Sequence, residues 1–274
     1  MPEGDTIHRS AAQLSVALTG KRVVKLELRR DPRGRRPPEP GTTVVGVEAV
    51  GKHLLVRFDD GQVLHTHMQM TGVWHVYRKG ERWRRPGHTA RVVLEVDDGT
   101  VAVCFAAPVV EFRRDTGERG VTTSAARSLA RLGPDLCEMD PDLDDVLARL
   151  ARLDPTTEIG VALLDQRVAA GIGNVYKSEV CWAERISPFT PLTSLDSETR
   201  RRLFATAHRL LRANLGSARR VTFRGGLAVY GRAGRVCPRC RTQVLRRVQG
   251  ADERLTFWCP TCQPDGVGLP GMHL

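Results

Sequence analysis

The stretch VCPRCRTQVLRRVQGADERLTFWCPTC, residues 236–262, decides the fold of the C-terminal part of this chain. It carries two Cys-x-x-Cys pairs separated by eighteen residues. Four thiolates at such a spacing are typical of a closed tetrahedral zinc site. Between the pairs, segments 242–248 and 254–258 predict two strands joined by a turn. We therefore expect one structural Zn2+ ion at the base of a β-hairpin, held by Cys237, Cys240, Cys259 and Cys262.

The other interpretation of these cysteines is two redox-active or free pairs. The remaining three, Cys104, Cys137 and Cys181, are expected to be small buried hydrophobic residues. An odd total of seven with four gathered at one end favours metal binding in a reducing cytoplasm over a disulfide framework.

Charge points to a polyanionic partner. The 274 residues include 42 Lys and Arg against 31 Asp and Glu, a formal net charge of +11. Nucleic acid is the most frequent partner of such a chain, although solubility or membrane attraction would also fit. No apolar run reaches the roughly 18 residues of a membrane helix, and residues 1–20 lack the apolar core of a signal peptide. We expect a protein without a membrane association.

The chain begins with Met1, Pro2 and Glu3. If Met1 is removed, Pro2 presents a secondary amine beside the carboxylate of Glu3. An α-amino group titrates near pH 8, so part of it is neutral at physiological pH. A neutral amine attacks a carbonyl carbon to form a Schiff base, and a secondary amine gives a cationic iminium. The alternative is that Pro2 follows Met1 without a chemical role.

Periodicity divides the chain into a β-rich and a helical part. Residues 5–19 predict an amphipathic helix capped by Asp5 or Thr6. An antiparallel sandwich or barrel is predicted from short β-rich runs between about 22 and 115, namely Val44–Val47, Leu54–Phe58, Val63–His65, Val92–Val96 and Val101–Phe105. Further helices are predicted at Asp142–Leu153, Thr157–Arg167, Val175–Arg185 and Ser197–Leu215. We expect three domains, residues 1–120, 121–222 and 223–274.

A glycine-rich bend, Gly171-Ile172-Gly173-Asn174, joins two of these helices. Its glycines allow a backbone to approach a ligand closely, and Asn174 is expected to cap the second helix. Backbone N–H groups at a helix start bind phosphate well. The bend alone could be a structural turn, but in a basic chain with a zinc hairpin it favours recognition of a DNA backbone.

Four motifs in this order resemble the formamidopyrimidine-DNA glycosylase/endonuclease VIII (Fpg/Nei) family, and the resemblance covers nearly the whole chain. They are Pro2-Glu3, Gly51-Lys52-His53-Leu54-Leu55, the Gly171–Lys177 turn and Val229-Tyr230-Gly231-Arg232. The chain is most similar to the actinobacterial endonuclease VIII-like branch, the second Nei paralogue. The resemblance implies a multidomain α+β protein with an N-terminal helix plus antiparallel β-sandwich, a helical helix-two-turn-helix domain and a C-terminal four-cysteine zinc-finger β-hairpin.

The resemblance also implies a bifunctional DNA glycosylase/AP lyase of base excision repair. Pro2 matches the nucleophile that attacks C1′, and Glu3 matches the acidic residue that assists sugar-ring opening and proton transfer. Lys52 matches the lysine that contacts phosphate and donates a proton in β-elimination. Arg254 matches the zinc-finger arginine of phosphate binding and δ-elimination, and Asn174 matches the asparagine that binds phosphates flanking the lesion. Taken alone, Lys52 and Arg254 could be ordinary exposed cations, and Glu3 could cap the first helix, a role that does not exclude a catalytic one.

Such an enzyme extracts its target nucleotide, and side chains fill the gap. The segment Thr66–Gly72 is similar to the family's wedge loop, with Gln69 and Met70 at the inserted positions. Met68 could instead belong to the core.

Two departures bear on the lesion. The segment before Tyr-Gly-Arg, Gly216–Ala228, is shorter than the loop that caps 8-oxoguanine in the formamidopyrimidine branch. That branch's Asp-Pro-Arg-Arg-Phe wedge is not recognisable around Ala107–Arg114. Both departures favour oxidised pyrimidines and ring-opened or hydantoin lesions over 8-oxoguanine.

The expected partner is double-stranded DNA with damaged bases or abasic sites, bound by a monomer in the bacterial cytoplasm. The alternatives are a non-catalytic or lyase-only binder of damaged DNA, a glycosylase that prefers oxidised purines, and a zinc-containing RNA-binding or transcription protein. The last explains neither Pro2-Glu3 nor the β-rich first domain.

Overall fold

The computed structural model describes residues 2–29, 33–34, 36–114 and 129–264. The chain forms two compact units, residues 1–131 and 132–274. The boundary predicted between residues 120 and 121 lies outside the described residues. No helix in the described part of the chain has both the length and the apolar composition to cross a membrane.

Unit 1 (residues 1–131) is a helix with two sheets. Helix α1 spans Gly4–Leu18. One sheet has the order β1-β7-β8-β6 and the other β2-β9-β5-β4-β3, with all neighbours antiparallel except β2 and β9. The strands are β1 Val23–Leu28, β2 Arg33–Gly34, β3 Val44–Val50, β4 His53–Phe58, β5 Gln62–His67, β6 Val73–Arg78, β7 Ala90–Val96, β8 Thr100–Phe105 and β9 Val109–Arg114, with a 3-10 turn at Gly87–Thr89.

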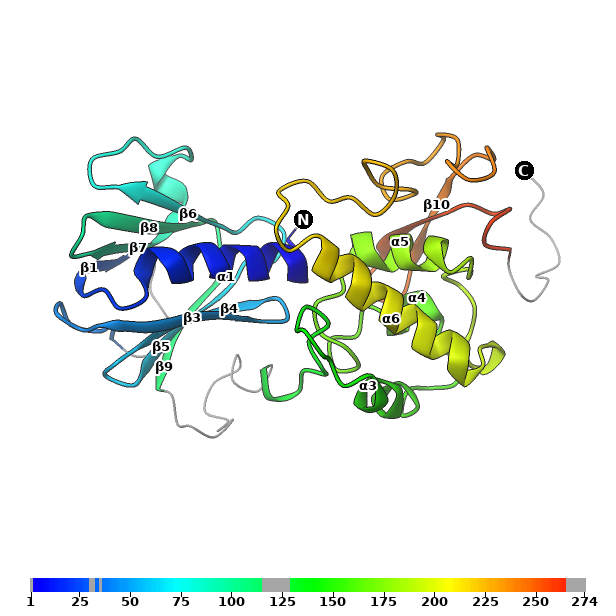
Figure 1. Ribbon diagram of the computed structural model, residues 1–274, viewed down its shortest axis with the longest axis horizontal. Coiled ribbons are helices and arrows are strands. Elements are labelled where there is room, and N and C mark those ends of the chain that lie inside the picture. Colours follow the sequence, from blue (N-terminus) through cyan, green and yellow to red (C-terminus); the bar gives the residue numbers. More distant parts are fainter. Residues whose placement is uncertain (1, 30–32, 35, 115–128, 265–274) are drawn as a thin grey trace. The chain divides into compact units, whose positions relative to one another are not determined.

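The core of unit 1 lies between the sheets. In Figure 1, α1 runs along the unit with β1, β6, β7 and β8 on one side and β3, β4, β5 and β9 on the other. Its apolar stripe, which includes Ile7, Leu14 and Leu18, is buried in this core with alternate strand residues such as Leu54 and Leu94. Apolar residues that recur about every 3.6 positions in the helix and every second position in the strands therefore pack into one core, as the sequence predicts.

The prediction that Asp5 or Thr6 caps α1 is wrong, whereas the alternative that Glu3 lies at the cap is confirmed. Glu3 occupies the N-cap position, and the N–H groups of Thr6 and Ile7 donate to its carbonyl oxygen at 2.9 and 3.1 Å. Asp5 and Thr6 consequently lie within the first turn. The helix starts at Gly4, one residue earlier than predicted, which places Pro2 directly before the cap.

Unit 2 (residues 132–274) combines helices with the hairpin. The elements are α3 Leu143–Leu150, α4 Ile159–Ala162, α5 Asn174–Ala183, a 3-10 turn at Leu192–Ser194, α6 Ser197–Ala213, β10 Leu245–Gln249 and β11 Arg254–Trp258. The helices share a core that includes Leu163, Tyr176, Phe204 and Leu211. The predicted architecture, a helix with two sheets followed by a helical region and a four-cysteine hairpin, is confirmed.

The helix predicted over Thr157–Arg167 is mostly absent, because only α4 is helical there. The carboxylate of Asp165 accepts hydrogen bonds from the backbone and the side chain of Arg167, each at 2.9 Å. The amide of Gln166 donates to the carbonyl groups of Leu164 and Ile172. These local bonds use backbone groups that a longer helix would need, so the chain turns instead.

Candidate active site and nucleic-acid interface

Pro2 and Glu3 lie at the start of α1. The Pro2 residue is partly exposed, whereas Glu3 is fully buried at 0% exposure. The N-terminus of a 15-residue helix carries a partial positive charge, which favours a neutral amine and an ionised carboxylate beside it. The position suits both members of an amine–carboxylate pair.

Lys52 lies at the tip of a two-residue turn. Val50 pairs with His53 across β3 and β4, so Gly51 and Lys52 alone connect the strands. Gly51 has φ 58°, a conformation that glycine adopts without steric cost and that two-residue hairpins require. Helix α1 packs against both strands, and its first turn lies at the same end of unit 1 as this tip (Figure 1).

The proposed wedge loop leaves the sheet at that same end. His53 of β4 pairs with His67 of β5, so the loop that begins at Met68 starts beside the Lys52 turn. Met68 is 1% exposed and belongs to the core, which confirms its alternative interpretation. Met70 is 58% exposed, and Gln69 is exposed with φ 44°. Unit 1 thus gathers all five residues predicted from its sequence, and the roles of all five stay predictions.

A histidine cluster lies behind the Lys52 turn and was not singled out from the sequence. The Nδ1 atom of His53 lies 2.9 Å from Nε2 of His65, and the ring centroids of His53 and His67 are 4.6 Å apart. Burial, with the nearby His65, His67, Lys52 and Arg113 charges, lowers the pKa of His53 to about 2. Burial likewise lowers the pKa of His65 to about 3. These imidazoles are therefore neutral at physiological pH.

This cluster predicts acid sensitivity. The unfolded chain binds protons at His53 and His65 once the pH falls below about 6.5, whereas the folded protein does not until about pH 3. Protonation of these two histidines in the unfolded chain should therefore lower the free energy of unfolding by about 4 kcal/mol between pH 7 and pH 5. Urea unfolding of unit 1 at both pH values measures this loss. The double variant His53→Leu/His65→Leu should lose less stability than the unsubstituted protein between pH 7 and pH 5. The variant His88→Gln, at an exposed histidine, should lose as much stability as the unsubstituted protein. Equal losses in all three proteins would contradict the assignment.

Asn174 connects the glycine bend to the hairpin. Gly173 occupies the N-cap of α5 and Asn174 is the first helical residue, so the predicted capping role is wrong. The amide Nδ2 of Asn174 instead donates to the carbonyl oxygen of Leu255 at 2.8 Å. Leu255 directly follows Arg254, which is exposed. The structure thereby brings two predicted phosphate-binding residues to adjoining parts of unit 2.

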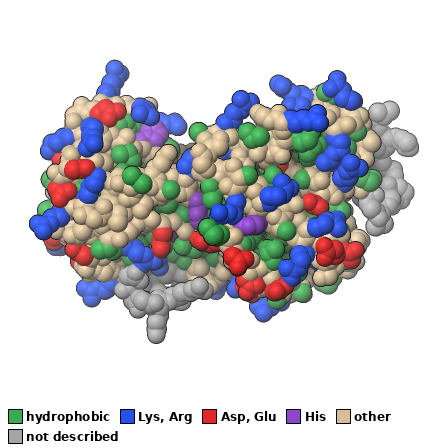
Figure 2. Space-filling model, viewed as in Figure 1, with side chains coloured by type: hydrophobic (Ala, Val, Ile, Leu, Met, Phe, Trp, Pro, Cys, Tyr) green, Lys and Arg blue, Asp and Glu red, His purple; other side chains and the backbone are tan. Residues whose placement is uncertain are grey.

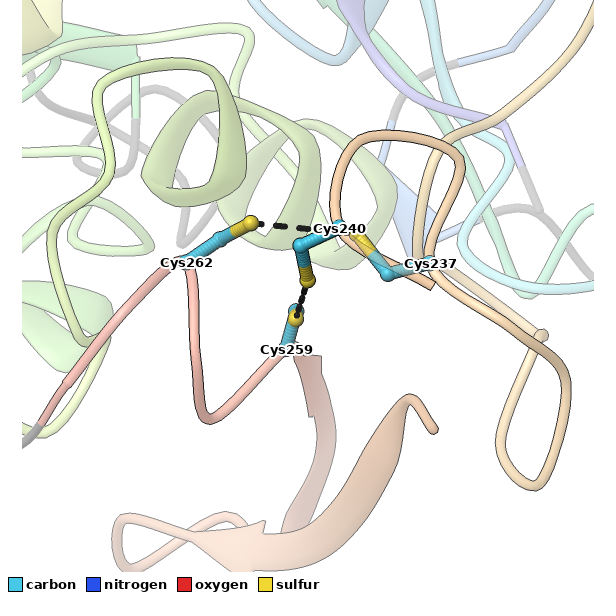
Figure 3. Close-up of side chains that lie close together, drawn as sticks. All are labelled: Cys237, Cys240, Cys259 and Cys262. Atoms are coloured by element: carbon cyan, nitrogen blue, oxygen red, sulfur yellow. Dashed lines mark hydrogen bonds between the residues drawn. The ribbon is translucent and has the colours of Figure 1, made fainter. Parts of the chain in front are cut away.

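The four cysteines of the two pairs converge at the hairpin base (Figure 3). Their sulfur atoms all lie within 4.8 Å of one another. Cys237 and Cys262 are 3.9 Å apart at sulfur, and Cys240 and Cys259 are 3.3 Å apart. Tetrahedral zinc with Zn–S bonds near 2.3 Å requires sulfur atoms about 3.8 Å apart, so the donor set fits this ion. The other cysteines, Cys104, Cys137 and Cys181, are buried as predicted.

The end of α5 holds the cluster in place. The indole Nε1 of Trp182 donates to the sulfur of Cys237 at 3.4 Å, and the guanidinium of Arg239 lies 3.9 Å from the centre of the Trp182 ring. At the second pair, the Oε1 atom of Gln263 accepts from the N–H of Cys259 at 2.9 Å. These contacts orient the ligands from outside the cluster.

Glu179 is a second residue that sequence patterns did not reveal. It is buried on α5 and its carboxylate accepts hydrogen bonds from three consecutive backbone N–H groups, those of Ala228, Val229 and Tyr230. The hydroxyl of Thr222 also donates to it. Glu179 therefore shapes the segment between α6 and the cysteines. The sequence signal that could have indicated this residue is an acidic side chain between Tyr176 and Val180, which are both core residues.

Charge within unit 2 is separated. Residues 219–254 hold ten arginines and two acidic residues, whereas residues 138–145 hold five acidic residues and no basic one. On the face drawn in Figure 2, Lys and Arg side chains gather over the part of unit 2 that carries the hairpin, and acidic side chains gather near α3. A polyanion is therefore attracted to the hairpin side.

Comparisons with known proteins agree with this geometry. Residues 1–107 match the formamidopyrimidine-DNA glycosylase N-terminal domain, and residues 132–223 match the H2TH domain of formamidopyrimidine-DNA glycosylase. A Streptomyces coelicolor protein described as a probable endonuclease 8 2 is 42% identical over 277 residues, covering 99% of this chain and 97% of the relative. DNA-(apurinic or apyrimidinic site) lyase Nei2 of Mycolicibacterium smegmatis is 38% identical over 269 residues, covering 96% of this chain and 99% of the relative.

Two solved structures show the same fold. The MutM (Fpg) protein of Thermus thermophilus superposes with a TM-score of 0.78 at 29% identity, over 97% of this chain and 100% of that one. A MutM complex with DNA containing carbocyclic 8-oxo-G has a TM-score of 0.79 at 22% identity, over 96% and 100%. With the motifs, the fold and the near-complete overlap with its relatives, the chain belongs to the Fpg/Nei family of DNA glycosylases and AP lyases, in the endonuclease VIII-like branch.

Proposed function

We propose that this chain excises oxidised bases from duplex DNA through a covalent intermediate at Pro2. The observation that carries the proposal is the meeting of three segments at one end of unit 1: Pro2-Glu3, the Lys52 turn and the Gln69-Met70 loop. The Pro2 nitrogen attacks C1′, the bond from C1′ to the base breaks, and the departing base takes up a proton. The Pro2 nitrogen gives up its proton, the C1′–O4′ bond then breaks as O4′ takes up a proton and becomes a hydroxyl group, and the product is an iminium at C1′.

Elimination follows from the iminium. It acidifies the C2′ hydrogens, so loss of one proton expels the 3′ phosphate, and a second elimination expels the 5′ phosphate. We assign Glu3 the role in sugar-ring opening and proton transfer, which its burial directly after Pro2 in the sequence supports. Lys52, half-exposed at its turn, is the proposed proton donor in β-elimination and a phosphate contact.

Oxidised pyrimidines are the lesions we favour. The segment 216–228 that follows α6 is short and holds a tight turn, Phe223–Gly226. Residues 109–114 form β9, paired with β5, in the region where the other branch carries a wedge motif. Both features support a site without the devices that hold 8-oxoguanine.

One Zn2+ ion per chain is the proposed cofactor, bound by the four clustered cysteines. A closed four-thiolate site stabilises a fold and leaves no position for substrate. We assign the ion a structural role, in which it holds the base of the β10–β11 hairpin.

Excision kinetics test the lesion class. Duplexes with 5-hydroxyuracil and with 8-oxoguanine, each opposite its ordinary partner, should be cleaved at different rates, with 5-hydroxyuracil faster. Faster release of 8-oxoguanine would contradict the pyrimidine preference. Binding of both duplexes without release of either base would identify a non-catalytic binder of damaged DNA.

Arg254 and Asn174 are the proposed phosphate contacts of unit 2. The Arg254→Ala variant should bind an abasic duplex more weakly, and the slope of log K against log salt concentration should become less negative by about one unit. Arg246→Ala is the matched control, since Arg246 is exposed on the same hairpin but points to its opposite face by the strand alternation. Fluorescence anisotropy from 50 to 300 mM salt measures the slopes, and an unchanged slope for Arg254→Ala would remove the contact.

A further inference from the structure

Lys177 is a buried charged residue that the proposed chemistry does not use. It lies on α5 at 0% exposure. Burial of an ammonium group is unfavourable unless hydrogen bonds replace its water shell. Its Nζ donates to the Oγ1 atom of Thr256 on β11, at 2.5 Å. A helix of the DNA-binding turn is thereby joined to the zinc hairpin through the protein interior.

The contact continues through two more side chains. The Thr256 hydroxyl donates to Oε1 of Gln249 on β10 at 2.7 Å, and Nε2 of Gln249 donates to Oε2 of Glu158 at 2.7 Å. The same amide donates to the carbonyl oxygen of Pro188 at 2.8 Å. In this series each hydrogen bond is donated in the direction from the Lys177 ammonium toward the Glu158 carboxylate. The bond dipoles therefore reinforce one another along the series.

Gly160 gives independent evidence that the fold accommodates Gln249. A Cβ atom at position 160 would lie 2.6 Å from Oε1 of Gln249 and 2.8 Å from the carbonyl oxygen of Pro188. Real Cβ atoms do not approach neighbours so closely, so a side chain here would displace the amide. The start of α4 is thus shaped to receive the end of β10.

The two middle members of this hydrogen-bonded series, Gln249 and Thr256, are neighbours of Arg254 in the hairpin. Gln249 is the cross-strand partner of Arg254, and Thr256 lies two residues further on the same face of β11. Arg254 itself lines a cleft of about 330 Å3 together with Asp165 and Gln166, which precede the glycine bend. The cross-strand partner of Arg254 and the residue two positions further along β11 are therefore held by buried polar contacts, while Arg254 itself is exposed.

We propose that a buried hydrogen-bonded chain positions Arg254 for its phosphate, and that its members, Lys177, Thr256, Gln249 and Glu158, are positioning residues for DNA binding. The inference rests on the proposed phosphate contact of Arg254. In this account Lys177 is buried because it anchors the hydrogen-bonded series. The hydroxyl of Thr256 should then affect DNA binding without contacting the DNA.

The test compares Thr256→Val, which removes the hydroxyl at nearly constant volume, with Thr256→Ser, which keeps it. Binding to a duplex with a tetrahydrofuran abasic analogue is measured from 50 to 300 mM salt, alone and combined with Arg254→Ala. Thr256→Val should shift the salt slope by about one unit, as Arg254→Ala does, and the double variant should shift it no further. Thr256→Ser should keep the slope of the unsubstituted protein. Gly160→Ala, which displaces Gln249 from outside the hairpin, should act like Thr256→Val.

Two results would overturn the proposal: an unchanged slope in Thr256→Val, or a shift in the double variant equal to the sum of the single shifts. Hydrogen exchange of the hairpin amides distinguishes failure of the phosphate contact from failure of the positioning role. If Arg254→Ala leaves the slope unchanged, the phosphate contact fails; faster exchange at 249–256 in Thr256→Val but not in Thr256→Ser would then still support positioning. Equal exchange in both variants would overturn it.

Discussion

Replacing Pro2 with glycine is expected to slow base excision by roughly 100-fold or more, while affinity for damaged DNA stays nearly the same. Proline gives an obligatory iminium, whereas the primary amine of glycine gives an imine that needs a further proton to become an electron sink. Glycine also removes the ring that restricts the backbone ahead of the Glu3 cap. Single-turnover excision of 5-hydroxyuracil measures the rate, and anisotropy measures the affinity.

Pro40→Gly provides the control, because Pro40 is an exposed proline of the same unit. It should leave both quantities unchanged. Unaltered excision in Pro2→Gly would remove Pro2 from the mechanism. A parallel loss of affinity and rate would instead assign Pro2 to DNA binding.

Replacement of Cys259 by serine should abolish stoichiometric zinc binding and loosen the β10–β11 hairpin. The alcohol is a far poorer ligand than a thiolate, and three remaining cysteines leave the tetrahedral site open. Zinc content should fall from about one ion per chain to near zero. Affinity for an abasic duplex should fall at least roughly tenfold, because the hairpin carries Arg254 and accepts the Asn174 amide through Leu255.

Cys181→Ala is the matched variant, since Cys181 is buried in the helical core of unit 2 and is not a member of the four-cysteine cluster. Elemental analysis should find its zinc retained. Zinc retained at full occupancy in Cys259→Ser would refute the four-cysteine assignment, and unchanged DNA affinity in the zinc-free variant would separate the hairpin from DNA binding.

Local signals in the sequence predict the hairpin well. The second strand, β11, has the predicted bounds of 254–258, because the cysteine pairs and the turn-rich 249–253 leave little choice of register. The α1 stripe is equally clear. At Thr157–Arg167 the apolar pattern is helical, yet the side chains of Asp165 and Gln166 bond to backbone groups of nearby residues, and the chain turns after α4. Whether side chains or helical hydrogen bonds use these backbone groups depends on local geometry, which the spacing of apolar residues does not reveal.

The rest of the site depends on contacts between distant segments. His53, His65 and His67 alternate along two strands, but only the pairing of β4 with β5 brings them together. Lys177 precedes Thr256 by 79 residues and would be taken for an exposed lysine on its helix. It is buried because the hairpin packs over α5, a tertiary arrangement that no local pattern specifies.

Borohydride trapping tests the central claim most directly. The purified protein is incubated with a duplex containing an abasic site or 5-hydroxyuracil, reduced, and its N-terminal peptide is mapped by mass spectrometry. We predict a stable protein–DNA adduct at the nitrogen of Pro2, with Met1 absent. No adduct, despite a free Pro2 and tight binding of the duplex, would contradict covalent catalysis and leave a damaged-DNA binder on the same scaffold.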